Sequence, residues 1–265
     1  MIKKVIVIGG GPAGMIACGR LAEEIEKVIL IEKNNILGKK LRITGKGRCN
    51  ITNNADIEDF IKNVPTNPRF LYSAFYSFTN NDIIELLNKL GVKTKVERGE
   101  RVFPESDSAK EVADALKKYA LKKNVEWIKD EVVEICEENG KISGVKTKNS
   151  FFEADCVVLA TGGASYPLTG SNGSGYKLSQ KLGHTVISPK PSLIPIVTEE
   201  KWPEQLMGLA LKNIEISVYN KKNKKIYTDF GELLFTHFGL SGPTILSASA
   251  HMKNMESERY KISID

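Results

Sequence analysis

The feature that most constrains the fold is a glycine-rich turn between an apolar segment and a helical one. The chain runs KKVIVIGGGPAG and continues MIACGRLAEEI, so Gly9, Gly11 and Gly14 have the spacing G-x-G-x-x-G. Gly9 permits a tight turn, Gly11 lets the backbone approach a pyrophosphate, and Gly14 lets a helix pack closely on a strand. This pattern predicts a βαβ unit with a phosphate-binding helix N-terminus.

An acidic residue completes the fingerprint. The segment KVILIEKN reads as the second strand, and Glu32 stands at its end, 18 residues after Gly14. A carboxylate at this place accepts hydrogen bonds from ribose hydroxyls and disfavours a 2′-phosphate. A glycine turn that serves packing alone would not explain Glu32. The sequence therefore predicts dinucleotide binding.

The chain does not continue as a plain series of βαβ units. After the loop ITGKGRCNITN (43–53) come helical segments, an amphipathic helix DSAKEVADALKKYALKK, and an alternating stretch that turns at Asn139 and Gly140. The alternation predicts an antiparallel β-meander. The strand CVVLATGG then returns to the sheet. This order favours FAD over the NAD of a single-Rossmann dehydrogenase, because inserted loops can follow the length of FAD.

The loop at 43–53 is predicted to lie against the flavin. Gly45 and Gly47 permit backbone conformations that bring amides close to a ligand. Arg48 offers a planar cation, and Asn50 can both donate and accept at the rim of the ring. Cys49 can contact the flavin, although the chain has no C-x-x-C pair for dithiol chemistry. A purely structural loop is the alternative.

The sequence pattern changes near residue 190, from mixed helical and strand-like segments to mostly strand-like ones. Prolines stand at 189, 191 and 195, and strand-like segments then dominate up to YKISID. We expect an α/β, Rossmann-like FAD-binding domain at 1–190 that lacks its C-terminal segment. A partial, mostly-β substrate domain is expected at 191–265, because its last strand needs neighbours.

Charge and hydropathy exclude several classes of protein. The net charge of +6 comes from scattered lysines, and NKKNKK at 220–225 reads as a solvated hairpin turn, so no nucleic-acid partner is expected. No apolar run approaches the roughly 20 residues of a membrane helix, and the N-terminus does not read as a secretory signal. We expect a cytoplasmic protein with no membrane partner and no metal site.

Five segments, in this order, resemble the BaiN/RdsA-type flavoprotein family of NAD(P)/FAD-dependent oxidoreductases. They are GGGPAG, LGKKLRITGKGRCNITN, LATGGASYPLTGSNGSGY, LGHTV and LLFTHFGLSGPTIL. The resemblance covers essentially the whole chain and implies an FAD domain interrupted by a mostly-β domain. It also implies reduction of carbon–carbon double bonds in steroid-like bile acid intermediates, or oxidation of small amino ketones.

The chain departs from the pattern of this family in two ways. It reads NGSGY at 172–176 where relatives commonly read TGDGY, which removes a carboxylate near the ATGG strand. Chains of the family are also longer, and their last part normally supplies a strand of the FAD domain and an acidic contact to the ribityl chain. We therefore expect a C-terminally truncated chain that binds FAD weakly or not at all by itself.

The sequence predicts an FAD-dependent oxidoreductase that transfers a hydride between flavin and a small organic substrate, such as an enone or steroid-like C=C compound. NAD(P)H is the expected transient reductant, although a second G-x-G-x-x-G is not found. The alternatives are an amino-ketone oxidase, an inactive fragment, and an FAD-containing RNA-modifying protein. The oligomeric state is not predicted.

The predicted cofactor contacts lie in the glycine turn, the loop and the ATGG strand, together with the backbone of Val133 at the adenine. They are Gly9, Gly11, Pro12, Ala13, Gly14, Glu32, Lys33, Lys40, Gly45, Gly47, Arg48, Cys49, Asn50, Val133, Ala160, Thr161 and Gly162. The weaker catalytic candidates are Cys49, Asn50, Tyr166 and His237.

Overall fold

The computed structural model describes residues 2–255 and 259–265. The chain divides into two compact units, Met1–Val186 and Ile187–Asp265, so the division falls four residues before position 190. The helices of the first unit are α1 (Pro12–Leu21), α2 (Ile57–Lys62), α3 (Tyr72–Ser77), α4 (Asn80–Lys89), α5 (Ala109–Ala120) and α6 (Ser174–Lys181). Its 3-10 turns are Leu41–Gly47, Pro68–Leu71 and Pro167–Thr169. Its strands are β1 (Lys4–Ile8), β2 (Lys27–Glu32), β3 (Thr52–Asn53), β4 (Thr94–Glu97), β5 (Arg101–Pro104), β6 (Val125–Lys129), β7 (Val132–Glu138), β8 (Lys141–Thr147), β9 (Phe151–Glu153) and β10 (Cys156–Leu159).

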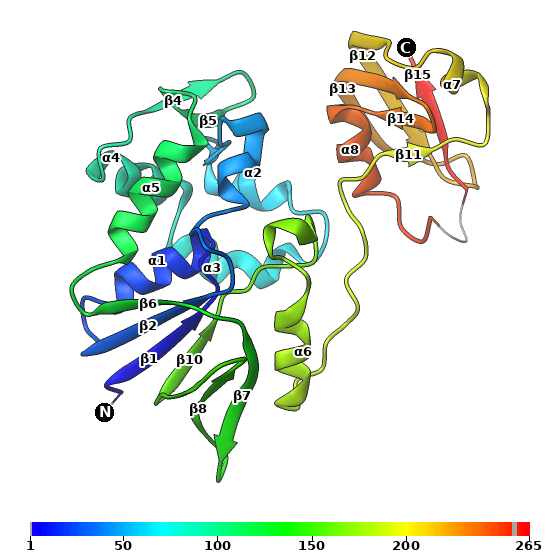
Figure 1. Cartoon of the computed structure of the whole chain (residues 1–265). Coiled ribbons are helices and arrows are strands. Elements are labelled where there is room, and N and C mark those ends of the chain that lie inside the picture. The colour runs from blue at the N-terminus through cyan, green and yellow to red at the C-terminus, as the bar shows by residue number, and fades with distance from the viewer. Residues whose placement is uncertain (1, 256–258) are drawn as a thin grey trace. The chain divides into compact units, whose positions relative to one another are not determined.

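A four-stranded parallel sheet forms the centre of the first unit, in the order β10-β1-β2-β6. Strands β1 and β2 are unbroken runs of Val, Ile and Leu, as expected for strands that are buried on both faces. Val7 and Leu30 point to a core shared with α1 and α5, whereas Ile6 and Ile29 point to a core shared with the meander and α6. The sheet is therefore the middle of three layers (Figure 1).

The predicted meander is present, but it begins later than its sequence pattern indicates. The segment VEWIK pairs in parallel with β2 as strand β6, and only β7, β8 and β9 form the antiparallel sheet. The chain leaves the parallel sheet at Asp130, between β6 and β7. Alternation alone cannot separate the two sheets, because an edge strand of a parallel sheet is also half-exposed.

The segment between β2 and α5 holds a small antiparallel sheet, β3-β5-β4, together with α2, α3 and α4. Helix α4 begins with a capping box, in which Thr79 and Asp82 satisfy each other's backbone amides. Helix α5 follows with Ser108 as its N-cap and returns the chain to the sheet at β6. The insertion thus extends the loop that follows β2 without interrupting the sheet.

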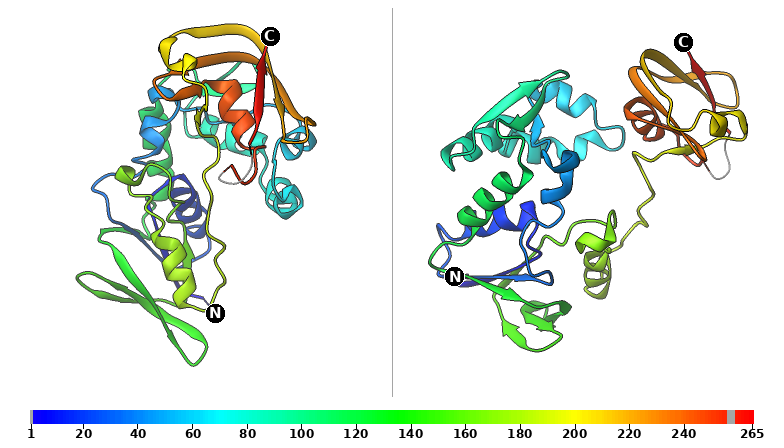
Figure 2. Two further views of the ribbon diagram at one scale, coloured as in Figure 1. Left: turned by 90° about the vertical axis from the view of Figure 1, so that its right-hand side faces the viewer. Right: turned by 45° about the horizontal axis from the view of Figure 1, so that its top comes forward.

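The second unit is an antiparallel sheet with two short helices. Its elements are β11 (Ile196–Val197), α7 (Trp202–Gln205), β12 (Ala210–Tyr219), β13 (Lys225–Thr236), β14 (Gly239–Ser241), α8 (Pro243–Ser249) and β15 (Lys261–Ile264), with strand order β11-β14-β13-β12-β15. Ile216, Leu233 and Ile245 belong to its core, where α8 packs on β13 (Figure 2). As predicted, NKKNKK forms the turn of the β12–β13 hairpin, closed by a hydrogen bond from the Asn220 amide to the Lys224 carbonyl.

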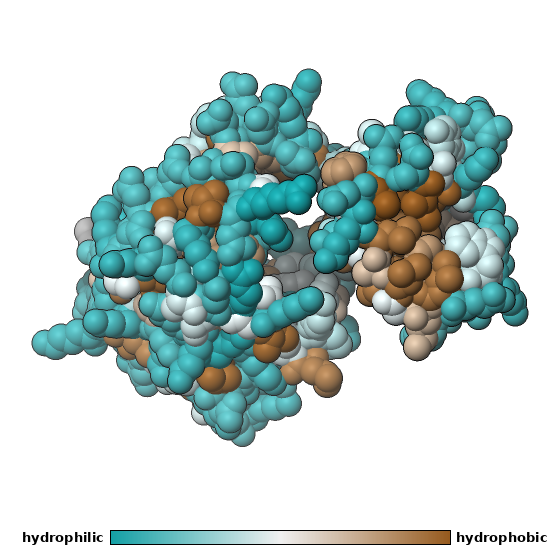
Figure 3. All heavy atoms as spheres, turned by 90° about the horizontal axis from the view of Figure 1, so that it is seen from above, coloured by the Kyte–Doolittle hydropathy of each residue, from teal (hydrophilic) through white to brown (hydrophobic). Residues whose placement is uncertain are grey.

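Several large apolar side chains of the second unit remain exposed, among them Trp202, Met207 and Phe230. Figure 3 shows apolar surface gathered on this unit. Within the described part of the chain, no helix combines the length and apolar character that a membrane crossing requires. The described residues also hold no cluster of three or more His, Cys, Asp or Glu side chains that is arranged for a metal ion.

Truncation of Leu30 in the central strand tests the three-layer core. Leu30 is fully buried, so Leu30→Ala leaves a cavity between β2 and the helical layer and should lower the free energy of unfolding by about 2–5 kcal/mol. Leu168→Ala is the matched control, because Leu168 is 90% exposed and its truncation should cost less than about 0.5 kcal/mol. Urea unfolding measures both. Equal losses for the two variants would contradict the assigned core.

Candidate functional site

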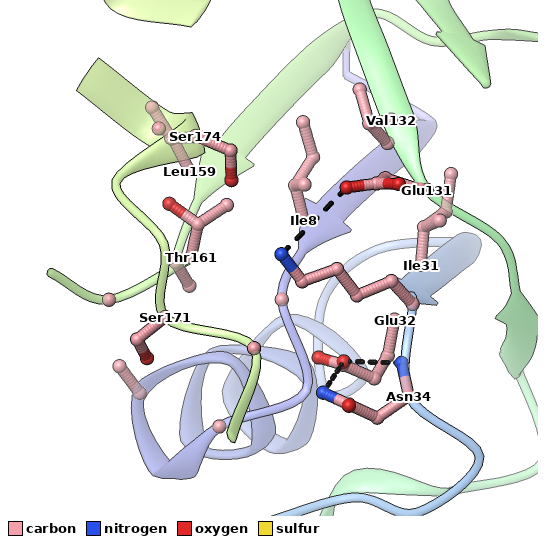
Figure 4. Close-up of a pocket in the computed structure, with 18 of the residues that line it drawn as sticks. Ile8, Ile31, Glu32, Asn34, Glu131, Val132, Leu159, Thr161, Ser171 and Ser174 are labelled. Carbon is pink, nitrogen blue, oxygen red and sulfur yellow. Dashed lines mark hydrogen bonds and ion pairs between the residues drawn. The ribbon is translucent and has the colours of Figure 1, made fainter. Parts of the chain in front are cut away.

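A cleft of about 590 Å³ opens at the carboxyl ends of the parallel strands. Its walls come from four parts of the first unit: the β1–α1 turn, the end of β2, the start of β7, and the segment from β10 to α6. Figure 4 shows Thr161 and Ser174 across the cleft from Glu32 and Glu131. In open α/β sheets this edge is the usual place for a ligand.

The glycine turn forms the base of the cleft. Gly9 has φ +107, and a Cβ on it would stand 2.5 Å from the Ala160 carbonyl oxygen. A Cβ on Gly14 would stand 1.8 Å from the Gly9 oxygen, so these two glycines are needed for packing. No heavy atom stands within 4 Å of the Cβ position of Gly11, which therefore faces open space. Packing alone explains Gly9 and Gly14 but does not explain Gly11.

The open space at Gly11 lies at the start of α1. Gly11 is the N-cap and Pro12 occupies the first helical position, where a missing N–H costs nothing. The amides of Ala13 and Gly14 belong to the first turn, which has no intrahelical acceptors. The first-turn amides and the helix dipole make this a favourable place for an anion.

Glu32 is held in a fixed orientation at the end of β2. One carboxylate oxygen accepts a hydrogen bond from the Gly10 amide at 2.6 Å. The other accepts two from Asn34, at 2.7 Å from the backbone amide and at 2.6 Å from the side-chain amide. The predicted ribose acceptor therefore lines the cleft. Sequence reasoning did not select Asn34.

Two predicted lysines also lie at the cleft, and both have partners. Lys33 Nζ donates to Asn172 Oδ1 at 3.1 Å and stands 3.8 Å from a carboxylate oxygen of Glu131. Lys40 Nζ donates to the Ser165 carbonyl at 2.7 Å. Cationic side chains from the β2 side thus reach the opposite wall.

The opposite wall is built by the ATGG segment and α6. Ala160, Thr161 and Gly162 line the cleft, and their contacts to a cofactor stay predictions. A Cβ on Gly175 would stand 2.2 Å from Thr161 Oγ1, so α6 packs tightly against the end of β10. The N-terminus of α6, with Ser174 and Tyr176, adds polar groups to this wall.

The register of β7 places the side chain of Val132, rather than that of Val133, at the cleft. Side chains alternate along a strand, and the valine that lines the cleft is Val132, which is 7% exposed. Val133 is 38% exposed, and its carbonyl accepts a hydrogen bond from Lys181 Nζ at 3.5 Å. An adenine contact through the Val133 backbone stays a prediction. Glu131, which precedes Val132, also lines the cleft. A hydrogen bond from Lys148 holds the pKa of the Glu131 carboxyl below its usual value.

The 43–53 loop does not line this cleft. Arg48 Nη2 contacts Glu97 at 2.5 Å and Asp107 at 2.6 Å, and its guanidinium stacks over the Phe103 ring at 4.3 Å. Glu97 and Phe103 belong to β4 and β5, and Asp107 follows β5. A contact between Arg48 and a cofactor stays a prediction. Arg48 anchors the loop to the small sheet.

The rest of this loop adopts an unusual backbone. Gly45 and Gly47 have positive φ, as expected, but so do Lys46 at +57 and Cys49 at +62. Cys49 is 1% exposed within the core shared with α1 and α5, and burial raises the pKa of its thiol. Asn50 is exposed next to it. Flavin contacts by Gly45, Gly47, Cys49 and Asn50 stay predictions.

The other catalytic candidates lie in different units. Tyr166 is in the first unit, 71% exposed, with φ +54 at the start of the Pro167–Thr169 turn. His237 is exposed in the second unit, in the turn between β13 and β14, with its ring edge-on to Phe238. The roles of Tyr166 and His237 in catalysis stay predictions.

The fold and the cleft together define a Rossmann-type dinucleotide-binding domain. The profile of the family described as HI0933-like protein Rossmann domain matches residues 3–253. The chain belongs to this family.

Two curated relatives are similar over most of the chain. A ribosomal RNA dihydrouridine synthase of Escherichia coli (strain K12) is 32% identical over 249 residues, which is 93% of this chain and 60% of the relative. A 3-dehydro-bile acid delta(4,6)-reductase of Clostridium scindens is 29% identical over 269 residues, covering 100% of this chain and 64% of the relative. The chain thus spans about three-fifths of the length of these relatives.

Solved structures are similar at lower identity. The L-proline dehydrogenase of P. horikoshii is 16% identical with a TM-score of 0.42, covering 99% of this chain and 81% of that one. The Sdh1 complex of Mycobacterium smegmatis is 20% identical with a TM-score of 0.47, covering 62% of this chain and 35% of that one.

The Arg48 anchor gives a pH-dependent prediction. Hydrogen bonds from Arg48 and Lys95 lower the pKa values of Glu97 and Asp107 in the folded state. The stabilisation is therefore present above the unfolded carboxyl values of about 4 and is lost as pH falls through the lowered folded values. Arg48→Met should lower the urea midpoint at pH 7, and the difference from wild type should shrink at pH values below about 4.

Arg98→Met is the matched control, since Arg98 is an exposed arginine in the turn between β4 and β5, next to Glu97. It should leave the midpoint near that of wild type throughout this pH range. A constant difference for Arg48→Met down to low pH would contradict the ionic nature of the anchor.

Proposed function

We propose that this chain carries the FAD-binding part of a flavin-dependent reductase that acts on a C=C bond conjugated to a carbonyl group. The observation that carries the proposal is the free space at Gly11, between the first-turn amides of α1 and the fixed carboxylate of Glu32. These groups match the pyrophosphate and the adenosine ribose of a dinucleotide.

The residues of the cleft fit FAD in the following way. The amides at Gly11, Ala13 and Gly14 would hold the pyrophosphate, and Glu32 would accept a hydrogen bond from a ribose hydroxyl. Val132 would cover one side of the adenine, since it brings apolar surface to the cleft beside Glu131. Thr161 and Gly162 would lie toward the flavin.

Flavin, when bound, supplies hydride transfer. Reduction of a polarised double bond takes up one hydride and one proton, so the protein must also supply or admit the proton. Tyr166 is the candidate among the predicted residues whose hydroxyl is accessible, because it is exposed in the loop that follows the ATGG segment. Cys49 is less suited, because its thiol is buried in an apolar core.

The substrate class is supported by what the two relatives have in common. Formation of dihydrouridine saturates a ring double bond of uracil that is conjugated to a carbonyl. A 3-dehydro-bile acid with Δ4,6 unsaturation likewise has double bonds conjugated to its ketone. Both names therefore describe reduction of an α,β-unsaturated carbonyl compound. We infer the same reaction class here, with NAD(P)H as a transient reductant in the cytoplasm.

RNA is the second candidate substrate, against the expectation of no nucleic-acid partner. The relative of 32% identity is a ribosomal RNA dihydrouridine synthase, and the net charge of +6 suits a polyanion. A steroid-like enone is the first candidate, because the carbonyl-conjugated double bond is then available without opening a folded RNA.

The experiment that tests the proposed function uses the protein as its gene encodes it, purified with FAD. NADPH is supplied anaerobically with either a 4-en-3-one steroid or ribosomal RNA. Mass spectrometry then measures the gain of one hydride and one proton in each substrate. A product with either substrate supports the reductase. Flavin that is reduced by NADPH but never reoxidised by either substrate would overturn the proposed substrate class.

Gly11→Ala separates the binding of FAD from the packing of the turn. The added Cβ meets no protein atom, so the midpoint of thermal unfolding should stay unchanged without ligand. The Cβ would occupy the approach to the pyrophosphate, so the Kd for FAD should rise by about tenfold or more. Titration with FAD, followed by flavin fluorescence, measures this change.

Gly231→Ala is the control substitution, because it adds the same methyl group in the second unit, beside Thr244. It should leave the Kd for FAD as in wild type. Wild-type affinity in Gly11→Ala would refute the assignment of the pyrophosphate site.

A further inference from the structure

Asn34 connects the two walls of the cleft. It lies two residues after Glu32, just beyond β2, and its backbone and side-chain amides both donate to Glu32 Oε1. The same side-chain nitrogen donates to the carbonyl of Thr169 at 3.2 Å. Its side-chain oxygen accepts a hydrogen bond from Lys39 Nζ at 3.3 Å. Both polar atoms of the Asn34 side chain thus have partners, and the bond to Thr169 reaches the opposite wall.

The bonds to Asn34 fix the direction of the Glu32 carboxylate. With Gly10 on one oxygen and Asn34 on the other, Glu32 cannot rotate without losing at least one short hydrogen bond. An ionised carboxylate offers about four acceptor positions. Gly10 and Asn34 together use three of them, so one position remains for a ribose hydroxyl, on the oxygen that accepts from Gly10. Asn34 therefore orients the carboxylate that would accept from the ribose and leaves the remaining acceptor position free.

On the opposite wall, Asn34 contacts the segment from Ser165 to Ser171, called here the 165–171 loop. It leads from the ATGG segment toward α6. Besides the bond from Asn34 to Thr169, its carbonyls accept hydrogen bonds from Lys39 at Leu168, 2.8 Å, and from Lys40 at Ser165, 2.7 Å. Three hydrogen bonds, donated by Asn34, Lys39 and Lys40, thus hold this loop against the segment that follows β2.

The fit between Asn34 and the loop is tight at Gly170. This glycine has φ +105, and a Cβ on it would stand 2.6 Å from Asn34 Nδ2. A side chain there would be strained and would also displace the amide that bonds Glu32. The loop is therefore shaped to receive the Asn34 amide, which an incidental surface contact would not require.

We propose that Asn34 is a positioning residue that couples ribose recognition by Glu32 to closure of the 165–171 loop over the cofactor cleft. The ligand is the adenosine half of a dinucleotide, so the proposal rests on the proposed function. The same NH₂ group of Asn34 donates to Glu32 and to the 165–171 loop. A ribose that hydrogen-bonds to Glu32 therefore also changes how firmly Asn34 holds the loop. The coupling is reciprocal, and a closed loop holds the carboxylate ready for the ribose.

Two measurements on the full chain test this coupling, with Asn34→Ala and Asn34→Asp as variants. Hydrogen exchange of peptides covering 165–171, without ligand, reports the loop. Calorimetric titration with ADP and with 2′-deoxy-ADP reports ribose recognition. Asn34→Asp keeps the shape of the side chain but places a second carboxylate against Glu32. Asn35→Ala is the control, because Asn35 is the exposed neighbour of the same type.

We expect faster exchange of the loop in both Asn34 variants, and a wild-type rate in Asn35→Ala. We also expect ADP to bind roughly fivefold more weakly in Asn34→Ala, the scale of one hydrogen bond. The affinity for 2′-deoxy-ADP should change less, so that the ratio between the two nucleotides falls toward one. A residue with a purely structural role would weaken both nucleotides alike.

The outcomes separate this proposal from the proposed function. Wild-type loop exchange together with a wild-type nucleotide ratio in both Asn34 variants would overturn the coupling. Faster loop exchange with an unchanged ratio would also overturn it, because Glu32 would then act independently of Asn34. If the wild-type chain bound neither ADP nor FAD, the proposed function would fail. In that case hydrogen exchange still tests the link between Asn34 and the loop, because it is measured without ligand. Unchanged exchange in the Asn34 variants would refute that link.

Discussion

Three backbone segments meet at Gly9, Gly14 and Ala160 more closely than side chains would permit. The start of α1 lies directly on the turn after β1, and that turn lies directly against the end of β10. The amide of Ala160 also bonds the carbonyl of Ile8, which continues the parallel ladder into the ATGG segment. Because this junction fixes α1 and β10 relative to β1, it sets both walls of the cleft. The position of every ligand-facing group described above depends on it.

The first half of the fold could be predicted from sequence because its determinants are local. The glycine spacing, the two Val/Ile strands and the acid at position 32 lie within the first 32 residues, and each carries its own physical meaning. The hairpin at NKKNKK is similarly local. The boundary between β6 and the meander was less predictable, because two different sheets produce the same alternation in adjacent segments.

The parts of the site that sequence reasoning placed differently depend on distant partners. The carboxylate partners of Arg48 follow 49 and 59 positions later, and no local pattern identifies them. The choice between Val132 and Val133 depends on the register of β7, which is set by pairing with β8. Asn34 attracts no attention in the sequence, because its partner Thr169 is 135 positions away. Local chemistry thus identified residues that line the cleft more readily than the residues that orient them.

The strand order of the parallel sheet also governs how the protein can assemble during synthesis. Strand β1 lies inside the sheet, and one of its neighbours, β10, pairs Val5 with Cys156, 151 positions later. Until β10 has left the ribosome, the first strand to emerge has one unpaired apolar edge, which favours misassociation. Contacts of such long range also slow folding, because the chain must close a large loop before they form. The edge of β1 that pairs with β10 therefore stays open until residues 156–159 have emerged from the ribosome.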